Sequence, residues 1–195
     1  PLCSRYWGTD FSAAALDHNR RMCDACLARG LAPIVTFHHF TTPRWVAARG
    51  GWTNAETAEL FGRFCARAAR RIGDVAVRVC TINEPSIVAT MGWLLGRFPP
   101  GKSDHDLRLR VNDVFVDAHR KAVEAIRAAA PGVPVGLTLS MTEYQATDGA
   151  EPRRERVLRD MEDVFLEATE GDDFVGVQVY TRMRLGPEGM LPPAD

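Results

Sequence analysis

The sequence predicts an α/β fold in which amphipathic helices alternate with the strands of a parallel sheet. Three observations lead to this prediction. Short apolar runs are separated by segments with helical periodicity, glycine or proline follows three of the helical segments, and polar and aromatic residues follow the strands. Four strands separated by helices amount to half of a (β/α)8 barrel of the TIM type. The 195 residues are few for a complete barrel, which needs about 200 to 250 or more.

Each of the four predicted strands is a short apolar run, rich in valine, isoleucine and threonine, between glycine, proline or polar residues. Runs without polar alternation are typical of parallel strands that are buried on both faces. The expected strands are Pro33–Phe37, Val77–Ile82, Pro134–Leu139 and Phe174–Tyr180.

The four predicted helices carry apolar residues three and four positions apart, which places them on one face. These helices are expected at residues 12–30, 53–72, 103–130 and 152–170. Ser12 is the expected N-cap of the first helix, Thr53 and Glu56 form an expected capping box in the second, and Pro152 lies in the first turn of the fourth.

Residues 86–102 are expected to form a long loop, and loops longer than about 12 to 15 residues are often functional. The chain contains no low-complexity linker and no shift in composition. We therefore predict one partial (β/α)8 domain over residues 1–195.

Composition excludes several classes of partner. The net charge of −1 gives no reason to expect nucleic acid or an anionic membrane. No run of 18 apolar residues is present, and no signal peptide is recognisable. The five cysteines are odd in number and lie mostly in apolar patterns, which favours reduced thiols and a cytoplasmic setting. Cys23 and Cys26 have CxxC spacing without a second pair, so structural thiols are expected rather than metal or redox chemistry.

The most informative residues are Asn83 and Glu84, directly after the second predicted strand. In a β/α barrel this strand end belongs to the catalytic rim. A carboxylic acid beside apolar surface can have a raised pKa and act as a general acid. Sugar chemistry uses such an acid to protonate a glycosidic oxygen, and an amide can hold the neighbouring hydroxyl. The alternative is a rim carboxylate paired with one of the many arginines.

His38 and His39 end the first predicted strand. Neighbouring strand residues point to opposite faces, so only one of the two can face the barrel interior, and a two-histidine metal site is not expected. That histidine could donate to a sugar hydroxyl or be purely structural. His119, between apolar positions of a helix, is expected to be a buried structural histidine.

Further candidates follow other strands. Tyr180 ends the fourth predicted strand, where its hydroxyl could reach the site or simply pack at the rim. Glu143 follows the third strand and is the one candidate within the chain for a second carboxylate. Four aromatic residues lie in predicted loops and could contact the apolar faces of sugar rings or pack as lids. These four residues are Trp45, Trp52, Trp93 and Phe98.

Together these segments resemble family 1 of the glycoside hydrolases, the β-glucosidase and β-galactosidase type of (β/α)8 barrel. The resemblance covers roughly residues 15 to 182 and depends on an ordered set of motifs. The motifs are Val35–Trp45, Gly50–Trp52, Thr81–Pro85, Gly92–Trp93 and Pro99–Gly101. It implies that the chain holds about strands three to six of the barrel with their helices.

The resemblance also implies a retaining β-glycosidase that needs no metal and no cofactor. Glu84 would be the acid/base, and Asn83 would bind the hydroxyl next to the anomeric carbon. His39 would hold another ring hydroxyl, Tyr180 would hydrogen-bond the nucleophile, and Trp93 would line the mouth. The substrate would be a small β-linked carbohydrate.

The chain departs from the family pattern at three positions. Ser86 stands where a tryptophan is common, and Ser140 and Gln178 stand where asparagine is usual. The family's nucleophile, a glutamate after strand seven, is expected beyond Asp195. We therefore expect this chain alone to be inactive, and we expect its two open sheet edges to favour self-association.

Other interpretations stay open on the sequence. One is a different barrel glycosidase, such as a cellulase-like enzyme. A second is a carbohydrate-binding protein or truncated relic without catalysis. A metal hydrolase using His38 and His39 is a third.

Overall fold

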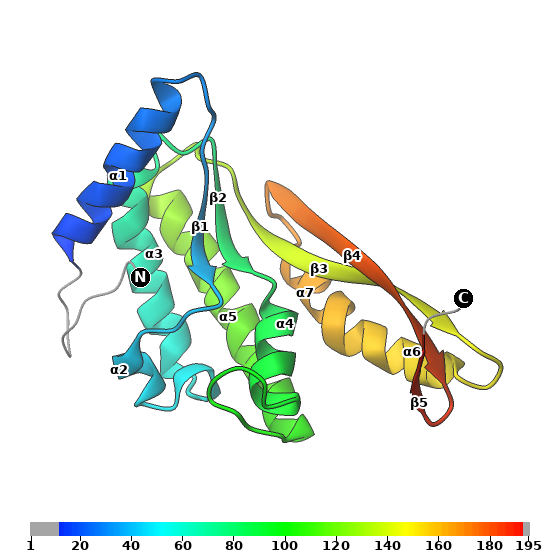
Figure 1. Ribbon diagram of the computed structural model, residues 1–195. Coiled ribbons are helices and arrows are strands. Elements are labelled where there is room, and N and C mark those ends of the chain that lie inside the picture. The colour runs from blue at the N-terminus through cyan, green and yellow to red at the C-terminus, as the bar shows by residue number, and fades with distance from the viewer. Residues whose placement is uncertain (1–11, 193–195) are drawn as a thin grey trace.

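A computed structural model describes residues 12–192 of the chain and contains one five-stranded sheet (Figure 1). The strands lie in chain order, with β1 to β4 parallel and β5 antiparallel to β4. They are β1 (Ile34–His39), β2 (Arg78–Asn83), β3 (Val135–Ala146), β4 (Phe174–Gly186) and β5 (Gly189–Leu191). Neighbouring parallel strands joined by helices are the repeating units of a (β/α)8 barrel.

The helices that follow β1, β2 and β3 pack beside the sheet, and α1 precedes β1 (Figure 1). The α-helices are α1 (Ala13–Leu27), α2 (Arg44–Ala47), α3 (Glu56–Ile72), α4 (Pro85–Ala89), α5 (His105–Ala129), α6 (Glu151–Leu158) and α7 (Val164–Ala168). A 3₁₀ turn, η1 (Gly51–Thr53), precedes α3. Two π-helical turns, η2 (Thr90–Leu94) and η3 (Arg159–Asp163), continue α4 and join α6 to α7.

The hydrophobic core lies between the sheet and the long helices α3 and α5. Phe115 of α5 is fully buried, and its ring stacks on Trp52 with centroids 4.1 Å apart. The predicted four strands and four helical segments are therefore confirmed, with ends shifted by a few residues and with the fourth helix interrupted by η3.

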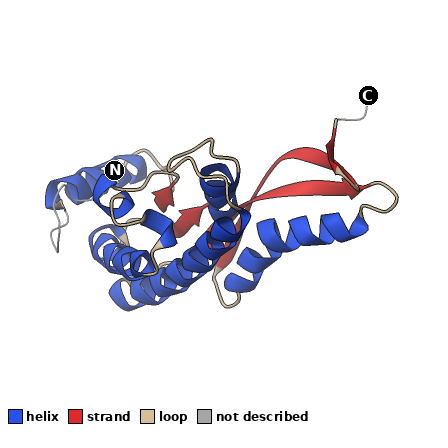
Figure 2. Cartoon of the chain, turned by 90° about the horizontal axis from the view of Figure 1, so that it is seen from below, coloured by secondary structure: helices blue, strands red, loops and turns tan. Residues whose placement is uncertain are grey.

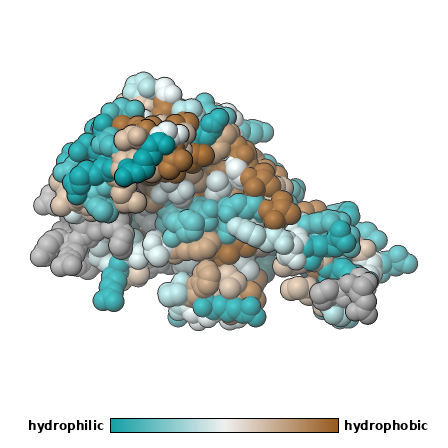
Figure 3. Space-filling model, turned by 45° about the horizontal axis from the view of Figure 1, so that its top comes forward, coloured by the Kyte–Doolittle hydropathy of each residue, from teal (hydrophilic) through white to brown (hydrophobic). Residues whose placement is uncertain are grey.

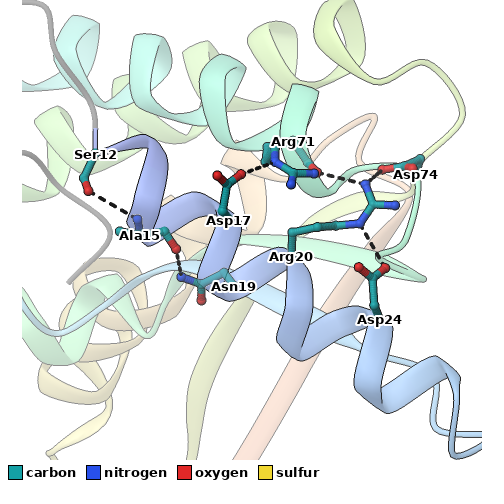
Figure 4. Close-up of polar contacts among 8 residues, drawn as sticks. All are labelled: Ser12, Ala15, Asp17, Asn19, Arg20, Asp24, Arg71 and Asp74. Carbon is teal, nitrogen blue, oxygen red and sulfur yellow. Dashed lines mark hydrogen bonds and ion pairs between the residues drawn. The ribbon is translucent and has the colours of Figure 1, made fainter.

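Polar contacts join α1 to α3 (Figure 4). The Ser12 hydroxyl accepts a hydrogen bond from the Ala15 amide, which confirms the predicted N-cap. Arg71 of α3 pairs with Asp17 at 2.6 Å, and Arg20 pairs with Asp74, just after α3, at 2.9 Å. These pairs are partly exposed, so they orient α1 more than they stabilise it.

The capping box expected at the start of α3 is wrong. The helix begins at Glu56, and its N-cap residue is Ala55, whose side chain makes no capping hydrogen bond. The Thr53 hydroxyl instead donates to the Gly50 carbonyl at 2.7 Å, and Asn54 accepts from the Glu56 amide at 3.0 Å. Gly50 and Gly51 both have positive φ and turn the chain into η1, so Thr53 is used inside the turn.

The expectation of a loop over residues 86–102 is also wrong in its first half, because α4 and η2 occupy residues 85–94. Pro85 at the first helical position starts α4, and its φ suits that position. Only the remainder of the segment is irregular.

The strands β3 and β4 are longer than expected. Seen from below, they continue past the other strands as a twisted ribbon with α6 alongside (Figure 2). A hairpin to β5, which the sequence did not predict, ends the ribbon. The extension is only partly buried and contains many polar residues, so it lacks the apolar run by which buried strands are recognised.

One face of β4 is uncovered in the described part of the chain. Val175 and Val177 pair with Leu137 and Leu139 of β3, and those leucines are buried in the core against the helices. The three valines of this β4 face, with Val179, are 39, 55 and 68 % exposed. Figure 3, in which the top of the molecule is turned forward, shows apolar surface on that side. The face is that on which a further helix of a barrel would pack.

Among the cysteines of the described residues, Cys23, Cys65 and Cys80 are buried and Cys26 is half-buried. Cys3 lies outside the described residues. Across residues 12–192, no helix combines the length and the apolar character needed to cross a membrane.

Candidate active site

The candidate site lies at the carboxyl ends of β1 and β2 and along the neighbouring parts of β3 and β4, because both of these strands continue beyond it and Tyr180 does not end β4 as expected. His39 pairs in register with Asn83, and Asn83 pairs in turn with Thr138 of β3. The register shifts between Cys80 and Asn83, which marks a bulge at the end of β2. Bulges re-aim side chains at barrel rims, and this one precedes the two residues that the sequence singles out.

The residues that follow His39 and Asn83 share an unusual conformation. Phe40 has φ of 62° and Glu84 has φ of 48°, in the left-handed region that residues with a side chain seldom adopt. The Glu84 amide donates to the Thr138 carbonyl at 2.8 Å, and Pro85 begins α4 directly afterwards. The chain therefore leaves two adjacent strands through a residue in the left-handed conformation, and each such residue carries backbone strain of order 1–3 kcal/mol.

Asn83 is held by its neighbours. Its Oδ1 accepts hydrogen bonds from the Thr138 hydroxyl at 2.9 Å and from Gln178 Nε2 at 2.9 Å. The Tyr180 hydroxyl donates to Gln178 Oε1 at 2.7 Å. Three strands, β2, β3 and β4, thus share one polar network around the Asn83 amide.

Glu84 is only 5 % exposed, yet its Oε1 is buried without a hydrogen-bond partner among the described residues. Ser86 Oγ, two residues later, is in the same condition. The Tyr180 ring is 70 % exposed, and the pKa of its hydroxyl is raised, first by desolvation and then by the adjacent Glu84 carboxylate. An unpartnered buried oxygen is costly, so it marks a group kept for another purpose than stability.

The two histidines have different surroundings. His38 is 5 % exposed, and its ring packs edge-on against Trp52 and Phe61 and tilted against Phe115. Burial, followed by the charge of His39, lowers the pKa of His38 to about 4. His39 is exposed and lies in register with Asn83. The structure therefore separates the pair, as the strand alternation predicts.

Trp93 is one of the aromatic residues that the sequence places near the site. It is 4 % exposed in η2 and, with Phe40 and Phe98, lines a largely apolar cavity of about 490 Å³. Trp52, expected in a loop, is 3 % exposed and belongs to the core. Trp45 lies in α2 and is half-buried.

Glu143, the candidate second carboxylate, is exposed and pairs with Arg182 at 2.9 Å. Its pKa is lowered by the hydrogen bond from Gln145 and then by Arg182. His119 has the structural role that was expected. Its ring is 1 % exposed, with Nδ1 2.8 Å from the Thr81 hydroxyl and Nε2 3.1 Å from Asp172.

Sequence reasoning did not identify Thr138 and recognised Gln178 only as a departure from a pattern. Thr138 lies on β3 at the register position opposite Asn83. Strand pairing was not available from the sequence, so only the polar residue within an apolar strand could have drawn attention to it. No group of three or more histidine, cysteine or acidic side chains within residues 12–192 has the geometry of a metal site.

A parallel sheet wound in chain order has an acid, an amide and a histidine at its carboxyl ends with a tyrosine on the neighbouring strand, which defines this chain as part of a (β/α)8 barrel. The model of glycosyl hydrolase family 1 matches residues 8–181. The chain therefore belongs to this family, and the predicted fold class is confirmed.

Curated relatives include the β-glucosidase of Agrobacterium sp., which is 36 % identical over 135 residues. That alignment covers 69 % of this chain and 29 % of the relative. The β-galactosidase of Saccharolobus solfataricus is 28 % identical over 200 residues, covering 86 % of this chain and 41 % of the relative.

The fold is also similar to those of solved structures. The β-glycosidase BGL167 has a TM-score of 0.82 at 36 % identity, covering 95 % of this chain and 50 % of that chain. The virulence factor SghA, solved with its substrate analogue salicin, has a TM-score of 0.87 at 26 % identity, covering 91 % of this chain and 46 % of that one. The chain thus spans about half the length of these two structures.

Proposed function

We propose that this chain carries the acid/base half of a retaining β-glycosidase site that acts on small β-linked sugars. The observation that supports this most directly is Glu84, a buried carboxylate with a free oxygen beside an amide held at the same strand end. The family membership and the names of the relatives support the same class of reaction.

In the proposed mechanism Glu84 first acts as an acid. It donates its proton to the glycosidic oxygen as the bond to the anomeric carbon breaks, so the leaving group departs as a neutral alcohol. A second carboxylate attacks the anomeric carbon from the opposite face and forms a covalent glycosyl intermediate. Glu84 then takes a proton from water, and the resulting hydroxide releases the sugar.

The other residues would bind the ring. The Asn83 amide would hold the hydroxyl next to the anomeric carbon, and His39, in register with it, would hold another hydroxyl. Tyr180, whose hydroxyl lies beside Glu84, would orient the second carboxylate once that group is in place. Trp93 would line the mouth from beneath, since its ring is buried.

The second carboxylate is proposed to come from outside the described residues. Retaining enzymes hold their two carboxyl groups about 5 to 5.5 Å apart. Glu143 is engaged by Arg182 and Gln145 and so is not offered to a sugar. We therefore expect no turnover of an aryl β-glucoside by the 195-residue chain.

A fusion tests this proposal. The chain replaces the aligned region of the Agrobacterium β-glucosidase, so that the segments on both sides of that region complete the barrel, and hydrolysis of an aryl β-glucoside is measured. We expect activity that Glu84→Gln lowers by about 10²- to 10⁴-fold, because general acid catalysis contributes that much. Glu143→Gln is the matched control and should leave the rate unchanged.

Two outcomes would contradict the proposal. A folded, active fusion that keeps its rate in Glu84→Gln would remove the assigned acid. Turnover by the 195-residue chain itself, lost in Glu143→Gln, would show that the second carboxylate lies within the chain.

We further propose that two copies of the chain associate. The exposed valines on β4 and the unpaired edge of β1 are features that soluble proteins normally cover. A second copy offers the same apolar face and the same free edges.

A further inference from the structure

We propose that Gln178 is a positioning residue that determines which end of the Asn83 amide faces the sugar. The proposal rests on the proposed function, because it concerns the amide that would bind the hydroxyl next to the reacting carbon. It adds a specificity for the hydrogen-bonding character of that group on the sugar.

The amide oxygen of Asn83 has no lone pair left for a ligand. An amide oxygen accepts two hydrogen bonds, and Oδ1 receives two, from Thr138 and from Gln178. The oxygen is thereby saturated. The amide nitrogen carries two N–H donors, which are left for a ligand. Asn83 therefore offers donors and requires an acceptor on the sugar.

The Gln178 amide is oriented by its contact with Tyr180. Its Oε1 is taken by the Tyr180 hydroxyl at 2.7 Å, and its Nε2 therefore points toward Asn83. Reversing Asn83 would place its N–H groups against the N–H groups of Gln178. Both amides would have to turn over together, and the Tyr180 hydroxyl would have to accept instead of donate. Gln178 thus couples Asn83 to the tyrosine beside Glu84.

Thr138 alone does not provide this selection. A hydroxyl can donate or accept, so it tolerates either orientation of Asn83. The Gln178 side chain differs at its two ends and is half-buried on β4. The orientation of Asn83 therefore follows that of Gln178 on β4, and the direction of Gln178 depends in turn on the Tyr180 hydroxyl acting as a donor.

The variant Gln178→Glu replaces the amide donor that faces Asn83 with an acceptor of nearly the same shape. A carboxylate still accepts from Tyr180 but cannot donate to Asn83 Oδ1. We expect Asn83 to turn so that its nitrogen donates to Glu at position 178 and its oxygen faces the ligand. Gln145→Glu is the matched control. It makes the same change on β3, where the Gln145 amide donates to Glu143 and not to Asn83.

The free chain gives the first measurement. Side-chain amide protons are followed by ¹⁵N NMR, assigned by their loss in Asn83→Asp and Gln178→Glu. In the unaltered chain the bonded Gln178 proton should exchange with water about tenfold more slowly than the Asn83 protons. In Gln178→Glu the Asn83 protons should become the protected ones, and Gln145→Glu should change neither. Protected Asn83 protons in the unaltered chain would overturn the proposal.

Sugar binding gives the second measurement, by titration with glucose and with glucosamine at a pH where its amine is protonated. A hydroxyl can accept from Asn83, whereas an ammonium group can only donate. The unaltered chain should prefer glucose. Gln178→Glu should shift the ratio of the two affinities toward glucosamine by at least about fivefold, the effect of one hydrogen bond. Gln178→Asn, one methylene shorter, should lose the preference but keep the melting temperature.

The two proposals fail in different ways. Absence of binding of either sugar would count against the proposed function, while the amide exchange rates still decide the role of Gln178. Glucose binding with an unchanged affinity ratio in both Gln178 variants would overturn the positioning role and leave the acid/base assignment standing.

Discussion

His38 should make the stability of this protein fall in mild acid. Its ring is 5 % exposed among Trp52, Phe61 and Phe115, and neither ring nitrogen has a hydrogen-bond partner within residues 12–192. Desolvation, followed by the charge of His39, lowers its pKa from 6.5 to about 4 in the folded chain. The unfolded chain therefore binds the proton first as the pH falls, so acid favours unfolding.

The size of the effect follows from the two pKa values. The difference between 6.5 and about 4 is worth roughly 3 kcal/mol when the pH has fallen to 4, and about 2 kcal/mol of this is already lost at pH 5. The loss begins as the pH drops through 6.5 and levels off below 4. This is a large share of the 5–15 kcal/mol that a domain usually has.

Urea unfolding of the unaltered chain and of His38→Phe at several pH values between 7 and 4 measures this term. Phenylalanine fills the aromatic site without titrating, so the free energies of unfolding of the two chains should diverge by about 3 kcal/mol across that range. His18→Phe, at an exposed position of α1, should follow the unaltered chain. Parallel curves for the unaltered chain and His38→Phe would refute the reasoning.

Two further predictions concern the buried His119 and the exposed valines of β4. His119→Ala should lower the free energy of unfolding by about 3 kcal/mol, because it leaves the Asp172 carboxylate without its partner and removes one of the two contacts of the buried Thr81 hydroxyl, whereas His119→Gln should cost less. Equal urea midpoints for all three chains would contradict this. Val177→Lys should convert self-associated chain to monomer in sedimentation velocity, since a charge on the exposed β4 face opposes its burial. A dimer that survives the substitution would place the contact elsewhere.

Much of the candidate site was predictable because its residues follow apolar strands. Asn83 and Glu84 stand at the end of β2, where the barrel architecture alone brings side chains together, whereas Tyr180 lies in the middle of β4 and not at its end as the sequence predicted. The ring of contacts that holds Asn83 was not predictable. It depends on the register that sets Thr138 against Asn83 and on the reach of Gln178 across β3. Nothing in the linear order of these residues encodes those distances.

The order of strands and helices could be predicted from local patterns in the chain, because an element that is buried on one face repeats its apolar side chains with its own period. Local patterns failed where backbone geometry competes with side-chain preference. Thr53 joined a glycine turn instead of capping α3, and residues 85–94 formed helix where the sequence suggested a loop. Only packing in three dimensions determined which of the two histidines is buried, enclosed Glu84 with an unpartnered oxygen, and joined three strands around the Asn83 amide. Burial and hydrogen bonding arise between residues that are distant in the chain, so they are settled by the fold and not by any short segment of it.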